Sequence, residues 1–349
     1  MTDRSPIHPY DAALSAEVEV ASPSRRQLLA AAALPAASAV PFVTATAGTR
    51  PMAPVIFHRE ATIDGLKLFY REAGPKDAPT LLLLHGFPSS SRMWTPLLSR
   101  LGGEFHVVAP DYPGFGHSDA PPPPEFAYTF DNLARSVERL VDHLGLRRYA
   151  LVMQDYGGPV GFRLALSRPE RVQAMVIQNA VSHLAGLGPL WDTRKAFWAD
   201  RTGHEAAIGA NLLSPAATRQ RHIGATPNPE LYDPDLWTDE AAFLARPGQR
   251  QIQTDLFYDY RTNVAAYPAW QAWLRDHRPS LLVTWGVYDP SFLPDGALAY
   301  GRDVPGAEIH LLKAGHFPMD EAPETVCDLT RRFLRRVMQP RRGPARTSS

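Results

Sequence analysis

The sequence is almost devoid of cysteine, since Cys327 is the only one among 349 residues. A single thiol cannot form an intrachain disulfide, so the folded chain must depend on its hydrophobic core. At this length, and with 44% hydrophobic residues, such a core needs neither disulfides nor a structural metal. Cys327 lies among apolar neighbours in the last amphipathic segment, and we expect it to be a buried small hydrophobe without a nucleophilic role.

The sequence also lacks net charge. It contains 36 basic and 36 acidic residues, which gives a formal net charge of +0 at pH 7. No long-range field would therefore attract nucleic acid or an anionic membrane surface, and we expect no nucleic-acid partner. The histidines show no metal-ligand spacing, so the sequence predicts a protein that works without a metal or another cofactor.

A long uninterrupted apolar run is missing as well. Arg25 and Arg26 precede a mildly apolar, alanine-rich stretch, Leu28–Val43, which prolines interrupt. A membrane span needs about 20 apolar residues, and this stretch is shorter. The arrangement resembles a twin-arginine export signal; a basic leader and a membrane anchor are the alternatives. We expect residues 1–47 to be cleaved near Ala47, leaving an exported, periplasmic or secreted protein with no stable membrane anchor.

Short apolar runs alternate with amphipathic segments through much of the chain. Residues 80–88, "TLLLLHGFP", form a continuous apolar run that ends in a glycine turn, which is typical of a strand buried on both faces. Similar strand-like and helix-like segments alternate over residues 54–182 and again over residues 276–338. This alternation predicts an α/β fold with a mostly parallel sheet.

The alternation stops between these two parts. Residues 183–275 are rich in Trp, Tyr, Arg and Pro, and they contain no strong strand pattern. We expect a helical cap here that covers the carboxyl ends of the strands, where ligands bind in open α/β sheets. Residues 339–349 are polar and basic, and we expect a disordered tail.

Three acid–base candidates each follow a predicted strand. Asp155 follows "YALVMQ", Asp289 follows "SLLVTWGVY" and His316 follows "AEIHLLKAG". Alone, each is most simply a turn, cap or loop residue. Together, at the carboxyl ends of strands in one α/β sheet, they point to a shared site.

These residues lie in motifs that resemble the α/β-hydrolase fold family over roughly residues 54–338. Residues 154–158, "QDYGG", look like the nucleophile elbow, with Asp155 where esterases and lipases carry serine, and residues 85–88, "HGFP", look like the oxyanion loop. The resemblance implies an eight-stranded, mostly parallel sheet flanked by helices, with a helical cap. One departure is Met153, which stands where many members have glycine.

An aspartate at the elbow implies the chemistry of the aspartate-nucleophile branch. A carboxylate is already ionised near neutral pH and can attack an sp³ carbon, which gives a covalent alkyl-enzyme ester. The resemblance implies that His316 then activates water, that Asp289 orients the imidazole, and that the backbone N–H groups of Phe87 and Tyr156 hold the oxyanion. Ordinary serine-esterase chemistry is excluded at this position, because it needs a hydroxyl.

The resemblance leaves two electrophiles open, an epoxide and a haloalkane. Phe87 and Tyr156 stand where dehalogenases commonly carry asparagine and tryptophan as halide donors. The segment "DYRTN" is similar to the part of the epoxide hydrolases that carries a lid tyrosine, here Tyr260. Against this, no tyrosine between Gly157 and Leu231 matches a first lid tyrosine, and the Gln154–Asp155 pair looks more like that of a dehalogenase. We favour an epoxide hydrolase acting on a small hydrophobic epoxide, with a haloalkane dehalogenase as the alternative.

Aromatic residues of the cap could contact the substrate. Trp191, Trp198 and Tyr258 are candidates, although aromatic side chains also serve simply to pack a cap onto a core. His204 is expected to be a surface residue. Two further interpretations remain, a cofactor-free hydrolase of another ester or C–C bond, and a non-catalytic binding protein. The presence of all three acid–base candidates argues against the latter.

Overall fold

The computed structural model describes residues 53–224 and 226–338. The predicted signal, residues 1–47, and the predicted tail, residues 339–349, lie outside these described residues. Within the described ranges, no helix is both long and apolar enough to cross a membrane. In the same ranges, no group of three or more His, Cys, Asp or Glu side chains is arranged so that it could hold a metal ion.

A single eight-stranded sheet forms the centre of the described chain, in the order β1-β2-β4-β3-β5-β6-β7-β8. The first two neighbouring pairs, β1–β2 and β2–β4, are antiparallel, and all the others are parallel. The predicted mostly parallel sheet is therefore confirmed. The strands are β1 (Ile56–Ile63), β2 (Leu66–Ala73), β3 (Thr80–Leu84), β4 (His106–Pro110), β5 (Tyr149–Gln154), β6 (Val172–Gln178), β7 (Leu281–Gly286) and β8 (Glu308–Leu312).

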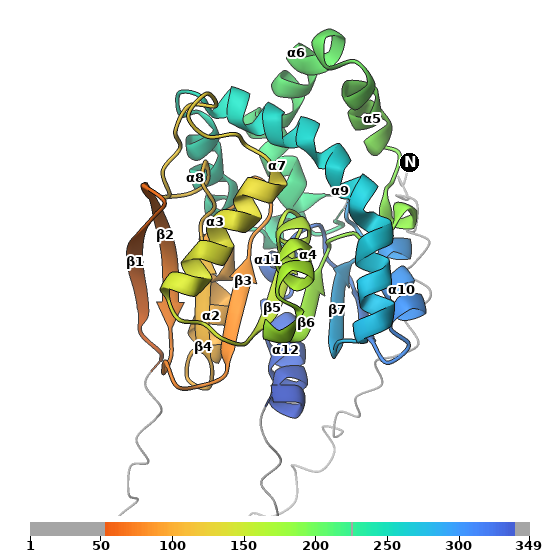
Figure 1. Cartoon of the computed structure of the whole chain (residues 1–349). Helices are drawn as coiled ribbons and strands as arrows, with labels where there is room; N and C mark the ends of the chain where they lie inside the picture. Colours follow the sequence, from red (N-terminus) through yellow and green to blue (C-terminus); the bar gives the residue numbers. More distant parts are fainter. Residues whose placement is uncertain (1–52, 225, 339–349) are drawn as a thin grey trace, which may run out of the picture. The chain divides into compact units, whose positions relative to one another are not determined.

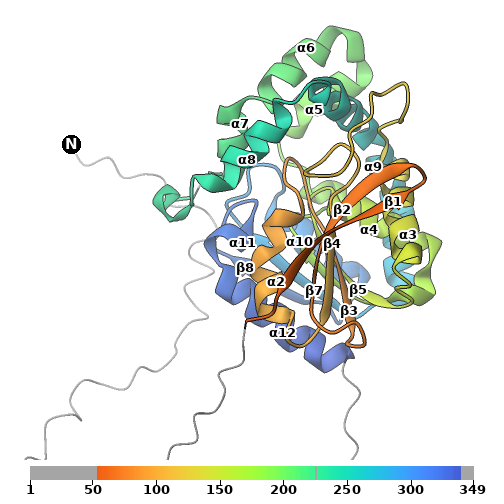
Figure 2. The ribbon, with the colours of Figure 1, turned by 90° about the vertical axis from the view of Figure 1, so that its left-hand side faces the viewer.

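Helices cover both faces of this sheet. Figure 2 shows α2 and α12 on one side of the strands, with α3 and α4 on the other. Alternate residues of β3 enter different cores: Leu82 and Leu84 pack toward α3 and α4, whereas Leu81 and Leu83 pack toward α2 and α12. The elements of this part are η1 (Ser91–Trp94), α2 (Thr95–Leu101), α3 (Phe130–His143), α4 (Gly157–Ser167), η2 (Pro169–Arg171), α10 (Pro294–Asp303), α11 (Pro318–Glu321) and α12 (Pro323–Met338).

Helices also make up the described part of the insertion between β6 and β7. They are η3 (Leu184–Gly186), α5 (Trp191–Ala199), α6 (Arg201–Leu212), α7 (Pro215–Ile223), η4 (Pro229–Leu231), α8 (Asp235–Leu244) and α9 (Gln249–His277). In both views α5 to α8 gather at one end of the sheet, the upper end in Figures 1 and 2. The long helix α9 runs from there along the core, where Trp270 stacks on Phe162 of α4 with ring centroids 4.9 Å apart.

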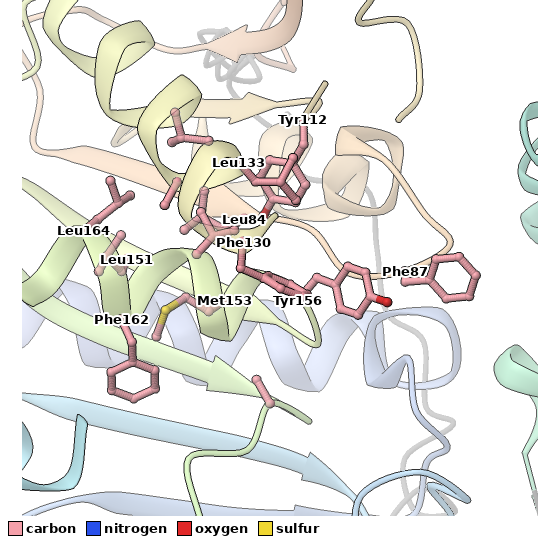
Figure 3. Close-up of a cluster of buried hydrophobic side chains, with 14 of the residues drawn as sticks. Leu84, Phe87, Tyr112, Phe130, Leu133, Leu151, Met153, Tyr156, Phe162 and Leu164 are labelled. Carbon is pink, nitrogen blue, oxygen red and sulfur yellow. The ribbon is translucent and has the colours of Figure 1, made fainter. Parts of the chain in front are cut away.

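Met153, the departure from the family pattern, is accommodated by a glycine on the following helix. Its side chain is fully buried in the cluster shown in Figure 3. A Cβ atom at Gly161 would lie only 2.0 Å from the Met153 sulfur. The elbow therefore tolerates a large residue two positions before Asp155, because Gly161 of α4 has no side chain where the Met153 sulfur packs.

We expect Gly161→Ala to lower the free energy of unfolding by about 1–3 kcal/mol, the usual range for an overpacked core. In a Met153→Ala background the same change should be neutral or stabilising, because the clash is gone and alanine favours the helix. Urea unfolding of the four proteins in this double-mutant cycle measures the difference. Equal effects of Gly161→Ala in both backgrounds would contradict the packing explanation.

Candidate active site

Asp155 occupies a sharp turn between the end of β5 and the start of α4. Its φ of +48° is unusual for a residue with a side chain and marks the turn as constrained. The loop after β3 approaches it closely, since a Cβ atom at Gly86 would lie 2.4 Å from Asp155 Cβ. On the other side, a Cβ atom at Gly157 would lie 2.0 Å from the carbonyl oxygen of Leu84. Glycine at both positions lets the two loops meet around the carboxylate.

The backbone of the Phe87 loop holds one oxygen of this carboxylate. The N–H group of Phe87 donates to Asp155 Oδ1 at 2.8 Å. Burial raises the pKa of Asp155, while the neighbouring His316 and the backbone N–H groups of Phe87 and Tyr156 act in the opposite direction. The structure thus brings together the two predicted oxyanion donors, and Figure 3 shows Phe87 and Tyr156 at the same edge of the buried cluster.

His316 lies between the two carboxylates. Its Nδ1 is 2.7 Å from Asp289 Oδ2, and its Nε2 is 3.7 Å from Asp155 Oδ2. Burial opposes the charged imidazole, but the two carboxylates outweigh it and leave the pKa of His316 raised. The three predicted acid–base residues therefore form one chain from Asp289 through His316 to Asp155. Such a chain can deprotonate a water molecule beside Asp155 and stabilise the resulting imidazolium.

Asn179, which the sequence analysis did not identify, fixes the position of Asp289. Its Nδ2 donates to Asp289 Oδ2 at 2.8 Å, and its backbone carbonyl accepts from the N–H of Asp155 at 3.3 Å. The backbone N–H of Ser291 donates to the other oxygen of Asp289 at 2.6 Å. Asn179 directly follows β6, so the pattern of polar residues after strands could have revealed it.

Gln154 contacts the imidazole from the last position of β5. Its Nε2 lies 3.0 Å from His316 Nε2 and 3.2 Å from the His316 carbonyl oxygen, while its Oε1 is buried without a partner among the described residues. An amide N–H suits a neutral imidazole as acceptor. Because the same Nε2 also donates to the His316 carbonyl oxygen, Gln154 holds the ring and the backbone of His316 together.

The carboxylate faces a small cavity of about 20 Å³ between the core and the cap. This volume is enough for about one water molecule. Residues of both parts form its wall: Phe87, Asp155, Tyr156, Trp191, Arg194, Arg221, Phe257, Ser291, Phe292 and His316. The insertion thus closes over the carboxyl ends of the strands.

Two of the predicted substrate contacts, Trp191 and Trp198, use their indole N–H groups elsewhere. Trp191 lines the cavity, but its Nε1 donates to the carbonyl oxygen of Ser291 at 2.8 Å. Trp198 Nε1 donates to the carbonyl oxygen of Phe257 at 2.8 Å, and its side chain is not part of the cavity wall. Neither indole is therefore free to donate to a ligand in this arrangement.

The predicted tyrosines lie at different depths. Tyr258 is half-buried, packs against Phe197 and lies outside the cavity wall. Tyr260 is fully buried behind the wall, with its ring centroid 5.9 Å from that of Tyr156 and 4.7 Å from that of Trp191. Its hydroxyl is buried and lies beside that of Tyr267. Burial, and then the neighbouring Tyr267, raise the pKa of Tyr260 well above its usual value.

Two arginines of the cavity wall, Arg194 and Arg221, also escaped the sequence analysis. Arg194 lies three residues after Trp191 on α5, on the same helical face. That spacing was a usable signal, because Trp191 was already a candidate. Arg221 near the end of α7 carried no comparable signal in the sequence.

Comparison with known proteins agrees with the observed fold. Residues 79–323 match the family described as alpha/beta hydrolase fold. An uncharacterised hydrolase of Saccharomyces cerevisiae is 40% identical over 269 residues, covering 76% of this chain and 92% of the relative. Haloalkane dehalogenase 2 of Mycobacterium tuberculosis is 43% identical over 273 residues, covering 71% and 85%. The solved structure of the epoxide hydrolase CorEH is similar in fold, with a TM-score of 0.67, 22% identity and coverage of 80% of this chain and 99% of that one. The chain therefore belongs to the α/β-hydrolase fold family.

Proposed function

We propose that this hydrolase opens an epoxide through a covalent ester on Asp155. Hydrolase-named relatives and the chain of hydrogen-bonding groups from Asp289 to Asp155 support an enzyme. The carboxylate at the elbow supports attack at an sp³ carbon, because a carboxylate needs no base to become a nucleophile.

The first half-reaction forms the ester. Asp155 Oδ1 is held by the N–H of Phe87, which leaves Oδ2 as the attacking atom. A new C–O bond forms between Oδ2 and a ring carbon as the ring C–O bond breaks, and the departing alkoxide takes a proton from a tyrosine hydroxyl. Tyr260 is the expected donor. The hydroxyl of Tyr156 is also buried without a partner among the described residues and is a second source of this proton.

The second half-reaction hydrolyses the ester. His316 Nε2 takes a proton from water as the water oxygen attacks Cγ of Asp155, and the backbone N–H groups of Phe87 and Tyr156 stabilise the oxyanion. The Cγ–O bond to the substrate carbon skeleton then breaks. The released alkoxide takes the proton held by His316 and leaves as the diol. The remaining proton of the attacking water passes from the Asp155 carboxyl to the tyrosinate left by the first half-reaction, so that Asp155, His316 and the tyrosine regain their starting states. The net reaction is epoxide plus water to diol.

One observation favours an epoxide over a halide. Two buried hydroxyls lie near Asp155: that of Tyr156 at the elbow, which has no partner among the described residues, and that of Tyr260 in the cap, which lies beside Tyr267. The indoles of Trp191 and Trp198 are instead already bonded to carbonyl oxygens. A departing alkoxide needs a proton, and a tyrosine hydroxyl can supply it. A departing halide needs no proton. Dehalogenation remains the second candidate, favoured by the relative named haloalkane dehalogenase 2.

Parallel incubation with epoxides and bromides tests this choice. We would offer 1,2-epoxybutane and 1-bromobutane as neutral compounds, and oxirane-2-carboxylate and bromoacetate as acids. Diol formation from either epoxide supports the proposal. If bromide ion is released from either bromo compound and no diol forms from either epoxide, dehalogenation replaces epoxide opening as the proposed function.

Tyr260→Phe should slow ester formation from the epoxide by about 100-fold, which is the usual contribution of a positioned proton donor. The ring and its packing remain, so the free energy of unfolding should change little. Rapid-quench measurement of the first half-reaction checks the rate. Tyr258→Phe serves as the matched control, because Tyr258 is half-buried and packs against Phe197, whereas Tyr260 is fully buried against Tyr156. An unchanged rate in Tyr260→Phe would transfer the donor role to Tyr156.

A further inference from the structure

Arg194 and Arg221 face the cavity with no acidic partner. Among the described residues, neither guanidinium forms an ion pair or a hydrogen bond, and Nη1 of each is shielded from solvent without an acceptor. Their described contacts are aromatic faces. The guanidinium carbon of Arg194 lies 4.2 Å from the ring centroid of Trp191, and that of Arg221 lies 4.6 Å from the ring centroid of Phe87.

Two such groups in one small cavity form an arrangement that is complete only with an anion. A guanidinium carries five N–H donors in a rigid fork that matches a carboxylate, and a buried donor without an acceptor is destabilising. The contacts with the rings of Trp191 and Phe87 hold both guanidinium groups over aromatic faces but satisfy none of the N–H groups. Burial lowers the pKa of Arg221 to about 10, and repulsion from Arg194 adds to this effect. A bound anion would accept from the free N–H groups and would offset the repulsion between the two arginines.

Asp155 is not that anion. Its two oxygens face the N–H of Phe87 and Nε2 of His316, and neither arginine is within ion-pair distance of it. Arg194 only assists in keeping Asp155 ionised, as the smallest of the influences on its pKa. Glu240, the other carboxylate that influences Arg221, is paired with His222 at 2.7 Å. The Nη1 donors of both arginines are therefore left for a ligand.

We propose that Arg194 and Arg221 bind a carboxylate of the substrate and thereby hold its reactive sp³ carbon against Asp155. This inference rests on the proposed function and names the substrate class. Both arginines line the same small cavity as Asp155, so a substrate that contacts all three must carry its carboxylate close to the reactive carbon, as a short acid with the epoxide one or two carbons from the carboxylate does. The apolar rings around the cavity then serve to orient the guanidinium groups as well as to exclude water.

Oxirane-2-carboxylate and oxirane-2-carboxamide test the proposal, because they share size and reactive ring and differ in charge. The wild-type protein should have a kcat/KM about 10- to 100-fold higher for the acid. Arg194→Gln and Arg221→Gln should each reduce this preference about tenfold or more, mainly through KM for the acid. Arg194→Lys and Arg221→Lys should recover part of it, since they restore the charge but not the fork.

Arg219→Gln is the matched control. Arg219 lies on α7, as Arg221 does, but it is exposed and lies outside the cavity wall. This variant should leave the ratio of kcat/KM for the acid to kcat/KM for the amide unchanged. An equal kcat/KM for acid and amide, or a ratio that neither glutamine variant alters, would overturn the inference.

Binding of unreactive propanoate separates this inference from the proposed function. Calorimetry should detect propanoate but not propanamide on the wild-type protein, and binding should be lost in the Arg194→Gln, Arg221→Gln double variant. If no epoxide is turned over while this pattern holds, the epoxide proposal fails and the anion site stands. If epoxides are turned over and propanoate does not bind, the anion site fails alone.

Discussion

His316→Gln is expected to stop the reaction after its first half and to leave the substrate attached to Asp155. Glutamine cannot take a proton from water, so the ester forms but is not hydrolysed. Steady-state turnover should fall by about 10⁴-fold or more, as when a member of a catalytic unit is removed. Mass spectrometry of the digested protein should find the substrate's mass added to the peptide that contains Asp155.

The control replaces the proposed nucleophile as well. Asp155→Asn keeps the shape of the side chain, and its Oδ1 can still accept from the N–H of Phe87. Combined with His316→Gln, it should form no adduct while the free energy of unfolding stays similar. Two results would argue against the ester on Asp155. One is an adduct on a different residue, and the other is the absence of any adduct in His316→Gln with a substrate that the wild-type protein converts.

His222→Gln should lower the free energy of unfolding by about 3–5 kcal/mol at pH 7, the range for breaking a buried ion pair. His222 is buried near the end of α7, with Nδ1 2.7 Å from Asp320 Oδ2 and Nε2 2.7 Å from Glu240 Oε2. Asp320 belongs to α11, shortly after His316, so this contact ties the cap helix that carries Arg221 to the core. Urea unfolding measures the loss, and the exposed His204→Gln in α6 should change stability by less than about 0.5 kcal/mol.

The pH dependence of this effect follows from the charge of the imidazole. Burial opposes protonation of His222, but Glu240 and Asp320 prevail and raise its pKa from 6.5 to about 10. A pKa raised by folding gives stability that is fully present below pH 6.5 and is lost as the pH rises toward 10. The stability of the wild type should therefore decline over this interval more steeply than that of His222→Gln. Parallel pH profiles for the two proteins would show that the ion pair contributes nothing.

The position of the acid–base residues was predictable because a parallel sheet aligns the ends of its strands. Asp155, Asp289 and His316 each follow a strand, and strand order places those ends at one edge. The same physical rule applies to Asn179, which follows β6. Local sequence was therefore sufficient for the residues carried by the sheet.

The residues carried by the cap were less accessible to sequence reasoning. Helical periodicity shows which residues share a face, but the angle at which a short helix packs on the sheet depends on distant contacts. Arg221 reaches the cavity for that reason, and Trp198 bonds a carbonyl of α9 that no local pattern identifies. Met153 and Gly161 show the same limitation within the core, since their compensation appears only when β5 and α4 are packed together.

A single turnover of the wild-type protein in water enriched in oxygen-18 tests the covalent ester most directly. With enzyme in excess over an epoxide that it converts, the account predicts that the first diol carries no label. The label should instead enter the carboxylate of Asp155, because water attacks Cγ and the original Asp155 oxygen leaves with the product. Label in the diol from the first turnover, with none in the Asp155 peptide, would mean that water attacks the epoxide directly and would contradict the account.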